Sequence, residues 1–439
     1  MKNNTNLNVL FWSIIVALGG FLFGFDTAVI SGVEEQIQKL FQLTPFWHGF
    51  TISSALFGTV IGALVAGQPA DKFGRKPILF IIAGLYVITA IGTAMAGNVS
   101  LFILFRFLGG IGVGASSVVA PMYIAEISPA KIRGKMTAMF QINVISGILI
   151  AYISNYLLRE FGTEPWRWML GVAGIPAVLF FLLLFLIPES PRFLIKIGEL
   201  AKAKAILEKI EVEAVDDEIQ EIKQSMEQTS NDHSQLFVKS HFKPISIAFL
   251  VAMFNQFSGI NAILYYAPRI FEASGLTNAD SMFQSILVGL MMGVFTLVGM
   301  LLIDKAGRKK LLIVGSIGMS TCLGLVARTF YLGDFTGSGL LILLLTYIMF
   351  FGFSTGAVIW VLIAEIFPNS IRGKGQSFGS FTHWLFAAII TFLFPVVIKL
   401  GVGHAFLFFS LMMLLQAIVV WRYFPETKGR TLEDLGTNL

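Results

Sequence analysis

Two ionisable side chains lie inside long apolar segments, where charge is costly. Asp26 stands in the sequence Phe-Gly-Phe-Asp-Thr, and Arg106 stands in the sequence Leu-Phe-Arg-Phe. A charge facing hydrocarbon costs at least about 2.5–3.5 kcal/mol, so both residues should face the protein interior. Arginine keeps its proton, whereas an aspartate near an arginine can bind and release one as its surroundings alternate between wet and closed. The pair predicts reversible proton binding by Asp26; the alternative is a static ion pair.

Several uncharged hydrogen-bonding side chains also lie inside apolar segments. Amides both donate and accept hydrogen bonds, which suits a ligand rich in hydroxyl groups. Gln256 and Asn261 are five residues apart, so a regular helix would leave them partly around its surface from each other. Each amide alone could instead bridge two helices. The candidate binding residues are Gln141, Asn255, Gln256, Asn261 and Trp360.

Three charged motifs occur twice in the same order. Asp71-Lys-Phe-Gly-Arg-Lys, Ala125-Glu-Ile-Ser-Pro and Pro188-Glu-Ser return as similar sequences at offsets of 233, 239 and 237 residues. Near-constant offsets indicate a duplicated half, and two halves with a site between them are typical of an alternating-access transporter. We predict that some of these charges pair across a cytoplasmic cleft and act as a latch; the alternative is a solvated collar. The predicted latch residues are Asp71, Arg75, Glu126, Arg133, Asp304, Arg308, Glu365 and Arg372.

The composition excludes a soluble fold. Apolar residues make up 56% of the 439 residues and charged residues 13%, about half the charged fraction of an average soluble domain. Apolar runs long enough to cross about 30 Å of hydrocarbon predict twelve membrane-spanning helices. Their expected ranges are 9–31, 49–70, 77–97, 100–125, 135–157, 167–187, 245–271, 281–303, 310–331, 338–364, 375–398 and 402–423.

The positions of the cations predict the orientation. Lysines and arginines gather in the even-numbered loops and near the C-terminus, whereas the odd-numbered loops hold few. By the positive-inside rule, both termini should be cytoplasmic. The net charge of +5 therefore reflects topology, and no nucleic-acid partner is expected.

One long polar segment separates the duplicated halves. Apolar residues at helical spacing within 199–210 and 213–228 predict short amphipathic helices on the cytoplasmic side. We interpret this segment as a linker that braces two bundles; a regulatory domain is the alternative. The expected all-α membrane protein has a six-helix bundle at 1–188, a linker at 189–244, a second bundle at 245–424 and a cytoplasmic tail at 425–439.

The motifs resemble those of the sugar porter family of the major facilitator superfamily. The repeated loop motif alone indicates only the superfamily. The combination of Pro188-Glu-Ser-Pro-Arg, Gln256-Phe-Ser-Gly-Ile-Asn and Pro425-Glu-Thr-Lys-Gly is more specific, and the resemblance covers essentially the whole chain. Aspartate at position 26 with arginine at 106 resembles the bacterial proton-coupled monosaccharide symporters; facilitative carriers have asparagine at the first position.

The resemblance also implies roles for individual residues. The amides of the fifth and seventh helices and the tryptophan of the tenth match the family's sugar-binding positions. Tyr265 and Tyr266 are expected at an outer gate, and Phe23 either packs against the sugar or belongs to the core.

Three positions depart from the family pattern on the C-terminal wall of the site. Asn255 replaces a glutamine, Met292 stands where asparagine is common, and His383 replaces an amide before Trp384. His383 is either a neutral hydrogen-bonding replacement or a second titrating group. The other histidines are expected in loops without evident chemistry.

We therefore expect a secondary active transporter that imports a monosaccharide, a hexose or a pentose, together with a proton. The alternatives are a facilitative uniporter, a sugar sensor that does not transport, and a drug/proton antiporter. We expect no enzymatic activity, cofactor or metal. The expected setting is the bacterial inner membrane, with the lipid bilayer around a functional monomer.

Overall fold

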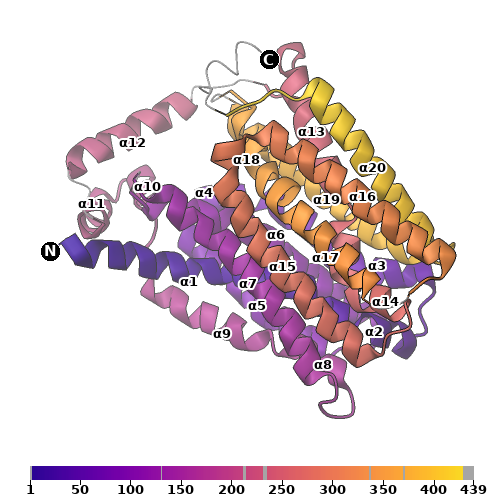
Figure 1. Ribbon diagram of the computed structural model, residues 1–439. Coiled ribbons are helices and arrows are strands. Elements are labelled where there is room, and N and C mark those ends of the chain that lie inside the picture. The colour runs from indigo at the N-terminus through magenta and orange to yellow at the C-terminus, as the bar shows by residue number, and fades with distance from the viewer. Residues whose placement is uncertain are drawn as a thin grey trace. The chain divides into compact units, whose positions relative to one another are not determined.

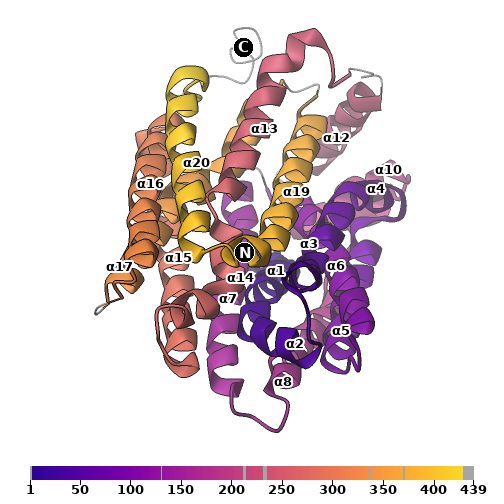
Figure 2. The ribbon, with the colours of Figure 1, turned by 90° about the vertical axis from the view of Figure 1, so that its right-hand side faces the viewer.

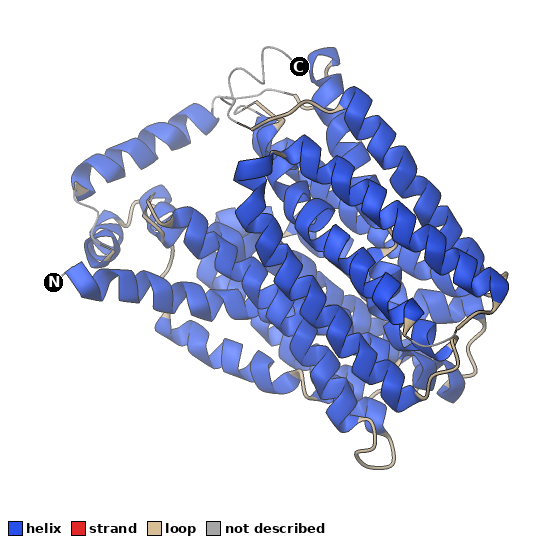
Figure 3. Cartoon of the chain, viewed as in Figure 1, coloured by secondary structure: helices blue, strands red, loops and turns tan. Residues whose placement is uncertain are grey.

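The computed structural model describes residues 2–129, 131–210, 214–230, 235–335, 338–368 and 371–428, and every regular element in these ranges is a helix (Figure 3). Within these described ranges, twelve helical segments are long and apolar enough to cross a membrane, which confirms the predicted number. Eight of these segments are single α-helices. They are α3 (Pro45–Val65), α5 (Arg75–Ala94), α6 (Val99–Ile127), α7 (Arg133–Leu158), α15 (Asn278–Ala306), α16 (Arg308–Leu332), α19 (Arg372–Ile398) and α20 (Val402–Tyr423).

The other four spans are extended by short helices or broken. Span 1 is α1 (Lys2–Val29) with a 3₁₀ turn at Ile30–Gly32, and span 6 is α8 (Pro165–Gly171), α9 (Gly174–Leu183) and a 3₁₀ turn at Leu184–Leu186. Span 7 consists of a 3₁₀ turn at Lys239–His241, α13 (Phe242–Phe257) and α14 (Ile260–Glu272); span 10 consists of α17 (Gly339–Phe351), a π-helical turn at Gly352–Gly356 and α18 (Ala357–Glu365). Short helices α2 (Glu34–Leu40) and α4 (Gly67–Phe73) follow spans 1 and 2 (Figure 1).

Large apolar side chains on the spans remain exposed. Leu301 is 72% exposed, Trp421 67%, Ile81 59% and Leu182 56%. A soluble protein seldom exposes so much apolar surface, whereas helices that face lipid must do so. The chain is a multi-pass membrane protein.

The described chain forms two compact units. Unit 1 comprises residues 1–26, 58–147 and 170–234, and unit 2 comprises residues 27–57, 148–169 and 235–439. The units differ from the predicted halves, because parts of spans 1, 2, 5 and 6 pack with the C-terminal spans. Contacts of this kind do not test the predicted boundaries of the halves, which remain a prediction. Most of the predicted tail lies outside the described residues.

In unit 2, α16 packs along α20 and α13 packs along α19 (Figure 2). An apolar core near one end of these helices includes Ile247, Leu312, Ile359 and Phe367, all at most 1% exposed. Phe378 of α19 also packs against this core, which therefore supports α13 and α19, the helices that carry Asn255, Gln256 and His383.

In unit 1, the polar segment after span 6 forms α10 (Pro191–Lys196), α11 (Leu200–Lys209) and α12 (Val215–Ser230), which pack on one another. The last two are the helices that the apolar spacing predicts.

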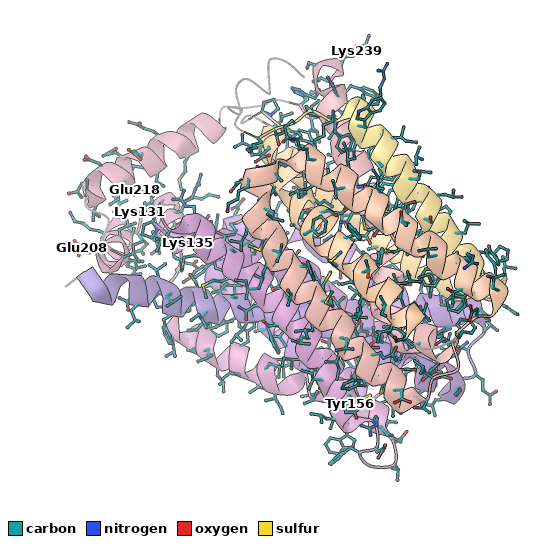
Figure 4. The ribbon with its side chains drawn as sticks, in the orientation of Figure 1. Lys131, Lys135, Tyr156, Glu208, Glu218 and Lys239 are labelled. Atoms are coloured by element: carbon teal, nitrogen blue, oxygen red, sulfur yellow. The ribbon has the colours of Figure 1, made fainter. Side chains whose placement is uncertain are left out.

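Figure 4 shows Lys135 at the start of α7 and Tyr156 near its other end. A cation at one end of a span and an aromatic ring at the other are common membrane anchors.

Candidate proton and substrate sites

Asp26 and Arg106 form an ion pair inside unit 1. Arg106 Nη1 donates to Asp26 Oδ1, which joins α6 to α1. The Arg106 side chain is 3% exposed and that of Asp26 is 25% exposed. Arg106 Nε and Nη2 are buried and have no hydrogen-bond partner among the described residues. The buried guanidinium therefore depends on Asp26 for charge compensation, and the structure assembles the predicted pair.

The amide cluster lies in unit 2, where span 7 is broken. Gly259 has a φ of +83°, which favours glycine, and it separates α13 from α14. Gln256 Nε2 lies 2.9 Å from Asn255 Oδ1, and Asn261 Nδ2 donates to Gln256 Oε1 at 2.6 Å. The three side chains are thus neighbours, although a regular helix would have held Gln256 and Asn261 partly apart.

His383 of α19 completes this cluster. Gln256 Nε2 lies 3.1 Å from each of the two ring nitrogens of His383. Because an amide nitrogen only donates, the ring accepts through an unprotonated nitrogen. This contact favours the neutral hydrogen-bonding role over a second titrating group.

Two tryptophan rings lie beside His383. The ring centroids of Trp360 and Trp384 lie 4.8 Å and 4.9 Å from that of His383. Trp360 is 38% exposed, whereas Trp384 is 7% exposed. The exposed indole of Trp360 offers an apolar surface beside buried hydrogen-bonding groups, which is the usual composition of a small-molecule site.

The remaining predicted binding residues, Gln141 of α7 and Phe23 of α1, are half-buried residues of unit 1. Unit 2 therefore assembles one part of the predicted site by itself. This part is the cluster of Asn255, Gln256, Asn261, His383 and Trp360.

A charge network surrounds the start of α5 in unit 1. Arg75 Nη2 lies 2.9 Å from Asp71 Oδ1 and 2.8 Å from Glu126 Oε1. Glu189 accepts hydrogen bonds from the backbone N–H groups of Arg75 and Lys76 at 3.0 Å and 3.2 Å. Burial of Glu189 raises the pKa of its carboxyl group above the ordinary value, although these N–H groups oppose the shift.

Unit 2 repeats this network around the start of α16. Arg308 lies 3.1 Å from Asp304 and 2.7 Å from Glu365. Glu426 accepts from the backbone N–H groups of Arg308 and Lys309 at 2.9 Å and 3.1 Å. Each of these ion pairs lies within one unit, so pairing of the predicted latch residues across a cleft remains a prediction.

Glu189 and Glu426 have capping roles that the repeated motifs alone did not predict. Each carboxylate caps the N-terminus of the helix that follows the repeated loop, where unpaired N–H groups and the helix dipole favour an anion. The repetition of Pro-Glu-Ser as Pro-Glu-Thr was the sequence signal that could have indicated these roles.

The other two predicted latch residues, Arg133 and Arg372, do not have matching contacts. Arg133 Nε donates to the carbonyl of Ala125 at 3.1 Å, whereas Arg372 Nε and Nη2 have no hydrogen-bond partner among the described residues.

The predicted gate tyrosines are buried in α14. Tyr265 is 1% exposed, and Tyr266, which is fully buried, donates to the carbonyl of Thr391 at 3.2 Å. The ring of His48 lies 5.9 Å from that of Tyr266. The expectation that histidines outside the site lie in loops was wrong for His48 and for His404. His48 lies in the first turn of α3 and is fully buried, and His404 lies in the first turn of α20.

Comparison with known proteins identifies the family. The family model described as "Sugar (and other) transporter" matches residues 12–439. The chain belongs to this sugar transporter family of the major facilitator superfamily. Similar relatives include the D-xylose-proton symporter of Escherichia coli K12, 36% identical over 99% of this chain and 96% of the relative. The arabinose-proton symporter of Bacillus subtilis is 37% identical over 97% and 94%, and the glucose transport protein of a Synechocystis strain is 38% identical over 97% of both chains.

Solved structures agree with this assignment. The inward open conformation of the xylose transporter XylE from E. coli matches this sugar transporter with a TM-score of 0.88 at 36% identity, over 98% of this chain and 99% of the other. XylE bound to 6-bromo-6-deoxy-D-glucose matches with a TM-score of 0.82 at 36% identity, over 99% of both chains. The predicted all-α major facilitator fold is thereby confirmed.

Proposed function

We propose that this sugar transporter imports a monosaccharide together with a proton by alternating access. The observation that carries the proposal is the ion pair between Asp26 and the buried Arg106. A titratable carboxylate inside a membrane span is costly and is a typical sign of a proton pathway. Relatives that are named proton symporters for xylose and arabinose support the same function.

The ion pair suggests how a proton could be coupled to the transport cycle. Protonation of Asp26 removes its negative charge and its attraction for Arg106, so the pair separates and the energies of the two access states change. Loss of the proton on the other side restores the pair and resets the carrier. The proton then acts as a ligand with different affinities in the two states, which is what a population shift requires.

We propose that the sugar binds at the amide cluster of unit 2; Gln141 and Phe23 of unit 1 remain predicted binding residues. Asn261 and Gln256 offer donors and acceptors to hydroxyl groups, and the exposed indole of Trp360 suits the C–H face of a sugar ring. We propose a pentose or a hexose as substrate, and a functional monomer as the working unit.

We further propose that both termini and the linker 189–244 are cytoplasmic, in a bacterial inner membrane, with bundles at 1–188 and 245–424. The cations of the even-numbered loops support this orientation. The two networks around Arg75 and Arg308 would then lie on the cytoplasmic side, where they could hold the inner gate, and Tyr265 and Tyr266 would lie toward the outside.

Uptake of labelled xylose, arabinose and glucose into proteoliposomes tests this function. A gradient of one pH unit, acid outside, stores about 1.4 kcal/mol, enough for about tenfold accumulation with one proton per sugar. We expect at least one sugar to accumulate and a protonophore to abolish the accumulation. Equilibration that ignores the gradient would identify a uniporter, and binding without uptake would identify a sensor.

A further inference from the structure

A buried carboxylate joins three helices of unit 2 at the odd-loop side, the end of the bundle that carries the odd-numbered loops. Glu34 lies in the first turn of α2, and its side chain is 1% exposed. Its Oε1 lies 3.1 Å from Nε of Arg269 in α14, and its Oε2 lies 2.9 Å from Nε2 of His48 in α3. The same His48 nitrogen lies 3.2 Å from the Glu34 carbonyl oxygen.

The burial of Glu34 makes these contacts necessary. A carboxylate removed from water is tolerated only with close counter-charges and hydrogen bonds, and removal of one partner leaves an uncompensated charge. Arg269 supplies the positive charge, and its Nη2 also donates to Gln38 of α2. The end of α14 is therefore attached to α2 at two points.

The helix held in this way carries part of the candidate substrate site. Asn261 lies near the start of α14, and Arg269 lies near its end. Gly259 separates α14 from α13, Tyr266 has the non-helical angles φ −124° and ψ 22°, and Pro268 lacks a backbone N–H group. These breaks allow α14 to move separately from α13, as expected of a gating segment.

We propose that Glu34 is a gating residue of the transport cycle, which latches α14 to α2 and α3 and so closes the odd-loop side of the site. This inference rests on the proposed function, which places that side outside the cell. Each cycle must then break the contacts of Glu34 with Arg269 and His48 before sugar enters and re-form them before it leaves. Tyr265 and Tyr266 form the moving wall, and Glu34 sets the stability of its closed position.

Cysteine labelling tests the proposal without any substrate. Cys322 is the only cysteine, so Cys322→Ser gives a background without thiols. Thr391 of α19 is fully buried and its carbonyl accepts from Tyr266, so Thr391→Cys reports on separation of α14 from α19. In this background, Glu34→Gln should raise the labelling rate by a membrane-impermeant maleimide from outside about tenfold, equivalent to about 1.4 kcal/mol.

A matched control and a double mutant exclude a general loss of structure. Glu164→Gln removes a carboxylate of unit 2 that is 46% exposed and paired with Arg167, so it should leave labelling unchanged. Arg269→Gln should reproduce the effect of Glu34→Gln, and the double variant should add little because both break one contact. If Glu34→Gln does not insert into the membrane, Arg269→Gln provides the same test.

Transport kinetics add a readout that general destabilisation would not give. A larger outward-open population lowers the apparent KM for external sugar, whereas slower closure lowers the maximal rate. A labelling rate within about twofold of the parent in both single variants, a difference of about 0.4 kcal/mol, would overturn the proposal. Failure of sugar uptake in the parent protein would instead count against the proposed function, because the labelling needs neither sugar nor a proton gradient.

Discussion

The amide nitrogen of Gln256 lies 3.1 Å from the ring nitrogens of His383, so an amide of the broken span 7 is hydrogen-bonded to a histidine of α19. Gln256 also donates to Asn255 and accepts from Asn261. Both amide hydrogens of Gln256 are therefore used inside the cluster. Its remaining lone pair and the free positions of Asn261 are left for sugar hydroxyl groups.

Replacement of His383 by asparagine should change substrate selectivity. His383→Asn keeps a hydrogen-bonding group but shortens and reorients it, so Gln256 gains a different partner. We expect proton-driven accumulation to persist while the ranking of competing sugars changes. Competition assays and accumulation should be measured on the same variant. Loss of accumulation would instead identify His383 as a proton carrier, and an unchanged ranking with unchanged coupling would reduce it to a packing residue.

Truncation of Gln256 should weaken sugar binding more than truncation of Gln141. Gln256→Ala removes the common partner of Asn255, Asn261 and His383 and strands their polar groups. Each lost bond costs about 0.5–1.5 kcal/mol net, and a stranded buried group costs more. Affinity should therefore fall at least several-fold in Gln256→Ala and Asn261→Ala, measured by equilibrium binding to purified protein. Unchanged affinity in these variants and in Gln141→Ala would place the sugar elsewhere.

The two capping carboxylates should contribute similar stability. Glu189→Ala and Glu426→Ala each remove an acceptor for two backbone N–H groups at the start of α5 or α16. Loss of a helix cap typically costs about 0.5–2 kcal/mol. Thermal unfolding in detergent should show a lower transition temperature for both variants, and Glu164→Ala provides an exposed control. Unfolding temperatures equal to that of the parent would show that water replaces these caps at no cost.

The sequence predicts the spans and the pairing of Asp26 with Arg106, because apolar length and buried charge impose strong energetic constraints. Its repeated motifs also predict the similar charge networks around Arg75 and Arg308. It predicts the neighbourhood of Gln256 and Asn261 less well, since their contact depends on the backbone break at Gly259. The burial of His48 against Glu34 was missed because the two residues are fourteen positions apart in different helices. Pairing of this kind depends on how helices pack, which periodicity does not specify.

The central claim is that Asp26 carries the coupled proton. Asp26→Asn keeps the size of the side chain and a hydrogen-bonding oxygen for Arg106, but it cannot titrate. Accumulation of a labelled sugar in proteoliposomes under an imposed pH gradient, acid outside, should be compared with exchange of sugar at equal pH. We predict that Asp26→Asn abolishes accumulation and largely retains exchange, whereas accumulation by this variant at the parent level would contradict the account.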